Sequence, residues 1–394
     1  MIAKRLRSSL DSAVCIRDIF EEGKKLAAIY GSENIINFTI GNPSVAPPAI
    51  VNESMIEILK EENSLSLHGY PANVGYPQVR AHIANYLNRT FGCDYDEDGI
   101  IMTVGAASAI AMIAHTLLDQ GDEVVTFAPY FWEYRSYVES FYGKLVPAYC
   151  NMETLQPDPV TFEAALSPRT RFVLINTPNN PTGAVYTDES LCAVTDILKR
   201  KQEEYGHPIY LVSDEPYRKL AYDIEVPYLT HYYKNTIVVY SYSKALSIPG
   251  ERIGYIAMEP CVEDMRDLYA GMTASMRYLG IVNAPTLQQK MLLKCVDASV
   301  DISIYRKTRD ILYNGLQEIG YTCIHPDGAF YLFVKALEED DSRFCERAKE
   351  EKILMAPGTA FYGPGWVRIS YCVTDDVAKR SLPAFRKLYE KYQR

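Results

Sequence analysis

Thr236-Ile-Val-Val-Tyr-Ser-Tyr-Ser-Lys244 is the most informative segment of this 394-residue chain. Its β-branched and aromatic residues predict a buried strand, which Lys244 directly follows. Open α/β sheets bind ligands at the carboxyl ends of their strands, so Lys244 is expected at a ligand site. A partly desolvated amine there can lose its proton and attack a carbonyl carbon. Most lysines at strand ends only reach solvent, so other strand ends have to support this interpretation.

Strands alternate with helical stretches between residues 49 and 285, which is typical of a mostly parallel sheet with helices on both faces. Gly105-Ala-Ala-Ser108 leads from one such strand into an apolar helix over 109–118. The sequence therefore predicts an α/β fold with a three-layer α/β/α large domain, residues 49–285. Besides the strand before Lys244, the expected strands are 99–104, 123–127, 171–175, 208–212 and 252–257.

The two ends of the chain are predicted to build a smaller α+β domain, because the length suggests more than one core. Residues 1–48 supply an N-terminal segment with a helix near Ser12–Tyr30, and residues 286–394 supply the rest. Spaced apolar residues predict one long amphipathic helix from Thr286 to Ile319. The strands expected in this domain are Tyr321–Val334 and Trp366–Val373.

Composition and charge exclude several classes of protein. A net charge of −10 without a basic block argues against nucleic acid as a partner. The segment Met1-Ile-Ala-Lys-Arg-Leu-Arg7 is not followed by an apolar region, so no signal peptide is expected, and no apolar run is long enough for a membrane span. Nine cysteines stand singly, without CxxC spacing, which favours reduced thiols in the cytoplasm over disulfides or a metal site.

Polar groups follow the other predicted strands as well. Gly105-Ala106-Ala107 opens a helix, whose free N–H groups and dipole favour a phosphate. Ser241 and Arg252 flank Lys244 and can complete a phosphate cup, since arginine grips phosphate with two hydrogen bonds. Asp214 ends a buried strand, so its carboxylate needs a cation or a proton. Singly, each group has a structural explanation; together they specify a phosphate, a pyridinium and a Schiff base.

Four motifs carry a resemblance to a known family: Asn179-Asn-Pro-Thr-Gly183, Asp214-Glu-Pro-Tyr217, Ser241-Tyr-Ser-Lys244 with Arg252-Ile-Gly254, and Val367-Arg-Ile-Ser370. With these motifs the chain resembles the fold-type I, pyridoxal-phosphate-dependent aminotransferases of class I/II, in the aspartate aminotransferase-like branch. The match extends from Ile40-Gly-Asn-Pro43 into the C-terminal domain. The resemblance implies transfer of an amino group between an L-amino acid and a 2-oxo acid by a ping-pong mechanism, in a homodimer.

The resemblance also implies roles for the residues around the cofactor. Lys244 forms the Schiff base and then moves a proton between the substrate Cα and the cofactor. Asp214 keeps the pyridine nitrogen protonated, so that the ring acts as an electron sink. Asn180 and Tyr217 hydrogen-bond the phenolic oxygen of the ring. The ring is expected to stack on Phe131, where many members have tryptophan, and the phosphate is expected to bind Ala106, Ala107, Ser241, Arg252 and, across the dimer interface, Tyr70 of the neighbouring subunit.

Substrate recognition is implied in the same way. Arg368 is expected to bind the substrate α-carboxylate, assisted by the backbone of Gly41 and the amide of Asn180. Arg277 precedes Asn283-Ala-Pro285, in a region where some aspartate aminotransferases place an arginine for a distal carboxylate. A surface or interface arginine is the alternative for Arg277. Aspartate and glutamate are therefore candidate substrates, and the many tyrosines equally allow aromatic or aliphatic ones.

Other classes of protein fit some of these residues, but most require further motifs that the sequence does not contain. Ser241-Tyr-Ser-Lys244 also fits the S-x-x-K of serine acylases, but the companion motifs S-D-N and K-T-G are absent. No G-x-G-x-x-G follows a strand, which disfavours a dinucleotide dehydrogenase. A transcription regulator with an aminotransferase-like domain would carry a basic DNA-binding module in addition. A β-lyase of the same fold shares nearly every cofactor contact and remains the alternative within the family.

Overall fold

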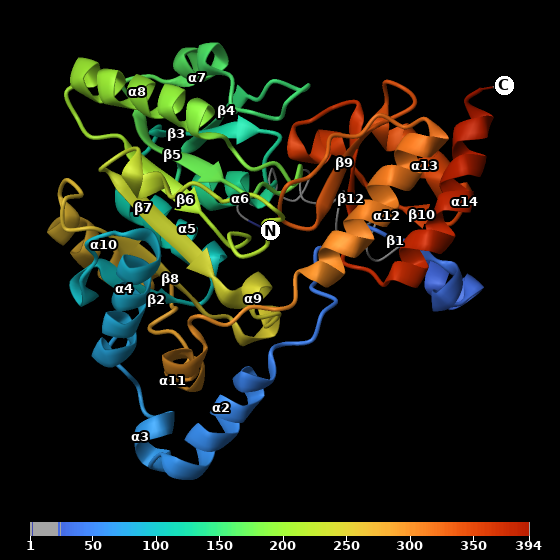
Figure 1. The fold of residues 1–394 in the computed structure, drawn as a ribbon. Coiled ribbons are helices and arrows are strands. Elements are labelled where there is room, and N and C mark those ends of the chain that lie inside the picture. The colour runs from blue at the N-terminus through green and yellow to red at the C-terminus, as the bar shows by residue number, and fades with distance from the viewer. Residues whose placement is uncertain (1, 3–22, 24, 394) are drawn as a thin grey trace.

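The computed structural model describes residues 2, 23 and 25–393, and the chain forms two bodies side by side (Figure 1). The larger body surrounds a seven-stranded sheet in the order β2-β8-β7-β6-β5-β3-β4. All neighbours pair in parallel except β8, which is antiparallel to β2 and to β7. The strands are β2 (Ile100–Thr103), β3 (Glu123–Ala128), β4 (Lys144–Tyr149), β5 (Thr170–Asn176), β6 (Tyr210–Asp214), β7 (Thr236–Ser241) and β8 (Gly254–Met258).

Helices cover both faces of this sheet, which confirms the predicted three layers. Side chains alternate between the faces, so that Val124 packs against α5 and α10 while Val125 packs against α7 and α8. The helices of the larger body are α2 (Ala49–Glu61), α3 (Ser64–His68), α4 (Pro77–Phe91), α5 (Ala106–Leu117), α6 (Glu133–Glu139), α7 (Pro159–Ala165), α8 (Asp188–Tyr205), α9 (Tyr242–Ala245), α10 (Met265–Tyr278) and α11 (Thr286–Cys295), with 3₁₀ turns at Glu97–Gly99, Leu229–His231 and Pro249–Glu251.

The smaller body combines both ends of the chain, as predicted. β1 (Ile36–Asn37) pairs in parallel with β10 (Ile353–Leu354), so the N-terminal segment is joined to the C-terminal one. A three-stranded antiparallel sheet lies beside this pair, in the order β11-β12-β9. The boundaries after residues 48 and 285 stay predictions. The other elements are β9 (Tyr331–Lys335), β11 (Ala356–Pro357), β12 (Trp366–Ser370), α12 (Ser303–Ile319), α13 (Asp341–Glu350), α14 (Asp375–Lys391) and 3₁₀ turns at Ser32–Asn34 and Gly358–Phe361.

Three expectations about local structure are wrong. The strand expected over Tyr321–Val334 begins only at Tyr331, as β9, and the segment before it is a loop with isolated bridges at Cys323 and Gly328. The single helix over 286–319 is two helices, α11 and α12, because the chain between them crosses to the smaller body and the Val300 amide donates to Ala245 O, 2.8 Å away. Lys244 does not directly end β7, because the strand stops at Ser241 and the side chain of Ser241 caps the one-turn helix α9, which carries Lys244. The helix expected near Ser12–Tyr30 falls largely outside the described residues.

None of the helices in the described part of the chain has the length and apolar character needed to cross a membrane. None of the eight cysteines in that part forms a disulfide.

Candidate active site

The carboxyl edge of the large sheet faces the smaller body across a cavity of about 710 Å³. Loops and helix starts that follow β2, β3, β5, β6 and β7 line it on one side, and β9 and β12 line it on the other. Such a position, at strand ends and between two bodies, is typical of a ligand site. The predicted site residues that line this cavity are Gly41, Ala106, Ala107, Phe131, Asn180, Asp214, Tyr217, Ser241, Lys244, Arg252 and Arg368.

Two predicted site residues lie outside the cavity. Tyr70 follows α3 and is 91% exposed, and Arg277 is exposed near the end of α10. The two segments are nevertheless connected, since the Asn73 side chain donates to Val282 O at 2.6 Å. Within one chain, therefore, neither side chain reaches the cavity that the other predicted residues form.

Lys244 projects from α9 into the cavity with its amine almost removed from water. Nζ donates to Gly41 O at 2.8 Å and lies 5.5 Å from the centre of the Phe330 ring. Burial lowers the pKa of the Lys244 amine from its ordinary value to about 8, and the nearby Arg252 and Arg368 lower it further. About a tenth of the amine is thus neutral, and therefore nucleophilic, at pH 7.

Asp214 ends β6 with a buried carboxylate that has one satisfied and one unsatisfied oxygen. The Tyr134 hydroxyl donates to Oδ2, while Oδ1 is buried without a hydrogen-bond partner among the described residues. Burial raises the pKa of Asp214 to about 7, against the hydrogen bond from Tyr134, which lowers it. An unpartnered buried carboxylate oxygen requires a donor, so the geometry fits a protonated ring nitrogen placed against Oδ1.

The turn between β2 and α5 has the geometry of a phosphate site. Gly105 has a φ of 89°, and a side chain there would meet the Arg252 guanidinium, because an added Cβ would lie 2.8 Å from Nη2. The N-terminus of α5 and Arg252 therefore converge, with Ser241 lining the same cavity. Free helix N–H groups together with a guanidinium bind phosphate oxygens well.

Arg368 approaches the cavity from β12 of the smaller body and is held from four sides. Its Nη1 donates to Asn180 Oδ1 at 3.0 Å, and its Nη2 donates to Thr39 O at 2.7 Å. The rings of Tyr331 and Phe361 lie 4.7 and 4.5 Å from its guanidinium carbon. Burial lowers the pKa of Arg368, but a guanidinium stays charged in proteins. The buried Nε has no partner among the described residues, so one edge of the fork is available to an anion.

Sequence reasoning missed two residues that complete the site. Tyr134 stands one helical turn after Phe131, at the start of α6, and that spacing was the available signal. Tyr331 begins β9, and its hydroxyl lies 3.0 Å from that of Tyr217. No local pattern connects Tyr331 with the site, because the antiparallel pairing of β9 with β12 brings it there.

Comparison with known proteins identifies the family. The model of the aminotransferase class I and II family matches residues 33–385. A probable aspartate aminotransferase of Methanocaldococcus jannaschii is 30% identical over 99% of this chain and 100% of its own length. An aspartate/prephenate aminotransferase of Thermus thermophilus is 31% identical over 90% of this chain and 91% of its own. The chain belongs to the class I and II aminotransferase family.

Solved structures agree with this assignment. The crystal structure of an aminotransferase from Eubacterium rectale has a TM-score of 0.97 and 47% identity, with both chains covered completely. Aspartate aminotransferase from Thermus thermophilus with maleate has a TM-score of 0.86 and 27% identity over 98% of this chain and 99% of the other. The protein is an aminotransferase of a pyridoxal-phosphate-dependent family, and the alternative of a β-lyase is not favoured.

The residues in the cavity fit this cofactor. The unsatisfied Asp214 Oδ1 suits a pyridinium N–H, the Gly105 turn with Arg252 suits the phosphate, and the Lys244 amine suits the aldehyde.

The lowered pKa of Lys244 predicts how covalent attachment of pyridoxal phosphate to the cofactor-free protein depends on pH. Only the neutral amine attacks, so the rate should rise about fivefold from pH 7 to pH 8, about twofold more to pH 9, and level off above that. Stopped-flow absorbance of the lysine-linked cofactor measures the rate. A rate that keeps rising up to the ordinary lysine pKa would show that the amine is not desolvated.

Proposed function

We propose that the protein transfers an amino group from an L-amino acid to a 2-oxo acid in this cavity, by a ping-pong mechanism. The observation that carries the proposal is that the Lys244 amine, the Asp214 carboxylate and the Arg368 guanidinium line the same cavity. Amino-group transfer on this cofactor requires an amine, a carboxylic acid and an anion-binding guanidinium close together. When bound, pyridoxal phosphate links to a lysine amine and supplies an electron sink for negative charge at the substrate α-carbon.

Six side chains and a helix start would hold the cofactor. Asp214 binds the ring nitrogen and keeps it protonated, since a carboxylate in a site of low polarity favours a neighbouring cation. The hydroxyl of Tyr217 and the amide of Asn180 bind the phenolic oxygen, and Phe131 stacks on the ring. The start of α5, at Ala106 and Ala107, binds the phosphate together with Ser241 and Arg252.

Lys244 would move the proton in the reaction. Its amine is buried, hydrogen-bonded to Gly41 O, and has a pKa lowered to about 8, so it can both accept and return a proton near neutral pH. Tyr134 orients the Asp214 carboxylate, because its hydroxyl donates to one carboxylate oxygen and leaves the other without a partner among the described residues.

Arg368 would bind the α-carboxylate of every substrate. Asn180 and Thr39 fix two of its donors, and the rings of Tyr331 and Phe361 pack against the guanidinium. A fork held in this way meets a planar carboxylate with two hydrogen bonds at little entropic cost.

The substrate side chain is a separate question. Several relatives are named aspartate aminotransferases, which supports aspartate or glutamate as a substrate of this protein. Among the described residues, the cations that line the cavity are Lys244, Arg252 and Arg368, all of which have other tasks. A distal carboxylate would therefore need a further cation, and the exposed Arg277 would supply it only from a neighbouring subunit.

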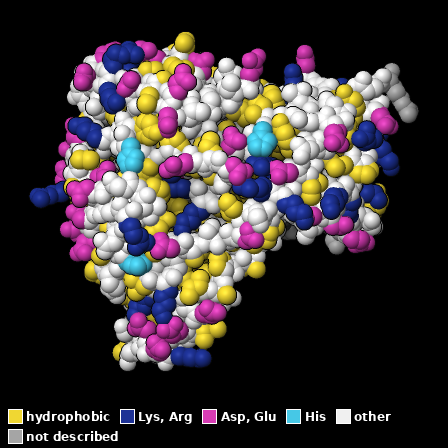
Figure 2. All heavy atoms as spheres, in the orientation of Figure 1, with side chains coloured by type: hydrophobic (Ala, Val, Ile, Leu, Met, Phe, Trp, Pro, Cys, Tyr) yellow, Lys and Arg dark blue, Asp and Glu magenta, His cyan; other side chains and the backbone are white. Residues whose placement is uncertain are grey.

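A homodimer with shared sites would bring Arg277 and Tyr70 of one subunit into the cavity of the other. The extension formed by α2 and α3 projects from the larger body, and its visible face mixes hydrophobic with charged side chains (Figures 1 and 2). Exposed hydrophobic groups that gather here and near the end of α10 suit burial in an interface. They are Ile56, Leu59, Leu65, Tyr70, Tyr278 and Val282, which are 40–91% exposed. Location in the cytoplasm stays a prediction from the sequence.

The test of the proposed function is a half-reaction without an acceptor. An amino acid mixed with the loaded enzyme should yield one equivalent of 2-oxo acid per site, with loss of the absorbance of the lysine-linked cofactor. Lys244→Ala should abolish this yield and the borohydride-dependent fixation of the cofactor. Lys219→Met is the matched control, since Lys219 is also partly buried with a pKa lowered to about 8, yet donates to Val296 O and Ala298 O outside the cavity. Borohydride fixation at another lysine in the Lys244→Ala protein would contradict the assignment.

Two arginine variants separate the α-carboxylate from the distal one. Arg368→Lys should weaken all amino acids alike, because a lysine cannot reproduce the two parallel hydrogen bonds. Arg277→Ala should cost aspartate and glutamate about 2–5 kcal/mol in kcat/KM and leave alanine and phenylalanine nearly unchanged. Single-turnover rates for the four amino acids measure both effects. An unchanged ratio of aspartate to alanine would show that Arg277 is structural and would remove the support for a dicarboxylate preference.

The shared site predicts complementation between two defective variants. Tyr70→Ala should weaken cofactor binding, and Lys244→Ala should be inactive, but a mixed dimer combines one intact Lys244 with an intact Tyr70 of the other subunit. Activity should therefore reappear when the two variants are dissociated and reassembled together. Failure to recover activity in mixed dimers, or a fully active monomer in sedimentation at assay concentration, would rule out the shared site.

A further inference from the structure

We propose that Tyr331 is a positioning residue that sets both the hydrogen bond of Tyr217 to the cofactor and the orientation of Arg368 toward the substrate. The inference rests on the proposed function, in which Tyr217 binds the phenolic oxygen and Arg368 binds the α-carboxylate. Neither Tyr331 nor a coupling between the other two residues follows from the motifs of the sequence.

The contacts of Tyr331 reach both groups at once. Its hydroxyl lies 3.0 Å from the hydroxyl of Tyr217, and the two rings meet edge to face at 5.7 Å. The face of its ring lies 4.7 Å from the guanidinium carbon of Arg368. Tyr331 lines the active-site cavity and is 2% exposed. One side chain of the smaller body therefore contacts a group for the cofactor and a group for the substrate.

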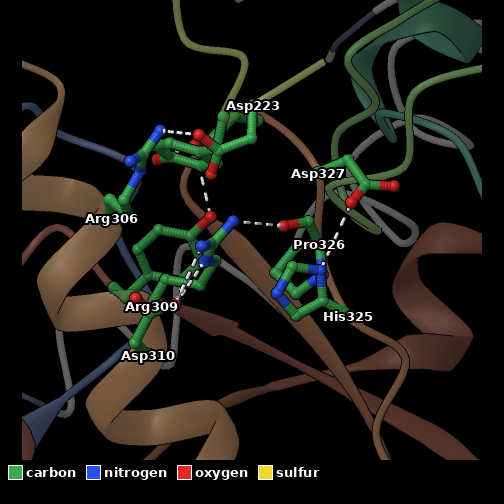
Figure 3. A network of polar contacts seen from close by, with 10 residues as sticks. Asp223, Arg306, Arg309, Asp310, His325, Pro326 and Asp327 are labelled. Carbon is green, nitrogen blue, oxygen red and sulfur yellow. Dashed lines mark hydrogen bonds and ion pairs between the residues drawn. The ribbon is translucent and has the colours of Figure 1, made fainter.

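A polar network holds the loop that leads into β9, the strand that begins with Tyr331 (Figure 3). In this network the Arg309 guanidinium donates to Pro326 O at 3.2 Å, and His325 contacts Asp327 at 3.2 Å. Further along, the Ala329 amide donates to Leu220 O at 2.8 Å, which ties the loop to the larger body.

The strand that follows is equally fixed. Tyr331 pairs with Ser370, two residues from Arg368 on β12, so the ring and the guanidinium share a rigid sheet. Gly41 leaves room for the hydroxyl, because an added Cβ at Gly41 would lie 2.1 Å from Tyr331 Oη. A side chain that is held rigidly from both sides can fix the position of another side chain.

The direction of the hydroxyl–hydroxyl bond follows from counting hydrogens. Tyr217 has one hydroxyl hydrogen, and the proposed function directs it to the phenolic oxygen of the cofactor. Tyr331 must then donate to Tyr217, and burial keeps it able to do so by raising the pKa of Tyr331 to about 12. A hydroxyl that accepts a hydrogen bond is a stronger donor, so Tyr331 strengthens the bond from Tyr217 to the cofactor.

This chain of hydrogen bonds has a spectroscopic consequence. A weaker hydrogen bond from Tyr217 would leave more negative charge on the phenolic oxygen of the cofactor. That charge would stabilise the proton on the neighbouring nitrogen, which joins Lys244 to the cofactor. The pKa of that nitrogen then rises, and the pH midpoint of the cofactor absorbance rises with it. A residue that only fills the core would leave this midpoint where it is.

Two substitutions separate the two tasks. Tyr331→Phe removes the hydroxyl but keeps the ring over Arg368, so it should raise the absorbance midpoint by roughly half a pH unit and leave KM values unchanged. Tyr331→Leu removes both, so it should shift the midpoint equally and raise KM about tenfold for every amino acid tested. Thermal unfolding of each variant reports any loss of folding, and the Phe variant keeps the volume of the site nearly constant.

A double-mutant cycle tests whether Tyr331 acts through Tyr217. Tyr217→Phe should raise the midpoint more than Tyr331→Phe does, and the double variant should match Tyr217→Phe alone. An unshifted midpoint in Tyr331→Phe, an additive double variant, or an unchanged KM in Tyr331→Leu would overturn the proposal while leaving the proposed function intact. An unshifted midpoint in Tyr217→Phe would instead overturn the assignment of Tyr217 and the hydroxyl part of this proposal with it.

Discussion

Parallel pairing of β5, β6 and β7 is the constraint on which the active-site cavity depends. In this register Asn176 lies opposite Asp214, and Asp214 lies opposite Val239, two residues before Ser241. Parallel strands end at one edge of a sheet, so the polar groups that follow them are brought together there. Side chains alternate across a strand, so a slip of one residue in β6 would turn Asp214 away from the cavity. Such a slip would also exchange the places of Leu211 and Val212, which pack in the cores on opposite faces of the sheet.

Burial at this edge of the sheet affects the protonation of each charged group differently. Desolvation brings the pKa of Lys244 down to about 8 and the pKa of Asp214 up to about 7, so both groups can change their protonation state near neutral pH. Arg368 is buried more deeply than Lys244, but its guanidinium cannot release its proton under these conditions. The same environment therefore produces a reactive amine and a permanent cation within one cavity. The rings of Tyr331 and Phe361 and the oxygens of neighbouring groups stabilise that cation.

The two bodies of the protein are joined by the residues that carry the chemistry. Arg368 belongs to β12, yet its partners Thr39 and Asn180 lie on two other segments, one leading out of β1 and one following β5 in the larger body. The Tyr331–Tyr217 contact crosses the same boundary. Any change in how the bodies sit would therefore alter substrate and cofactor contacts together. This coupling arises because Arg368, which would bind the substrate, belongs to the smaller body, whereas the phosphate site belongs to the larger body.

Local sequence was sufficient for the layers of the fold and for the motif residues around Lys244 and Asp214. Hydrophobic alternation and turn residues act over a few positions, and the groups at strand ends meet whenever the strands are parallel. The break between α11 and α12 could not be predicted in this way, because Val300 leaves the helical path to bond a carbonyl of α9. Tyr134 had only its spacing from Phe131 as a local signal and Tyr331 had none, so the contacts of both needed the tertiary structure. Their partners are 80 and 114 residues distant in the chain, and only the packing of α6 and the pairing of β9 with β12 bring them within hydrogen-bonding distance.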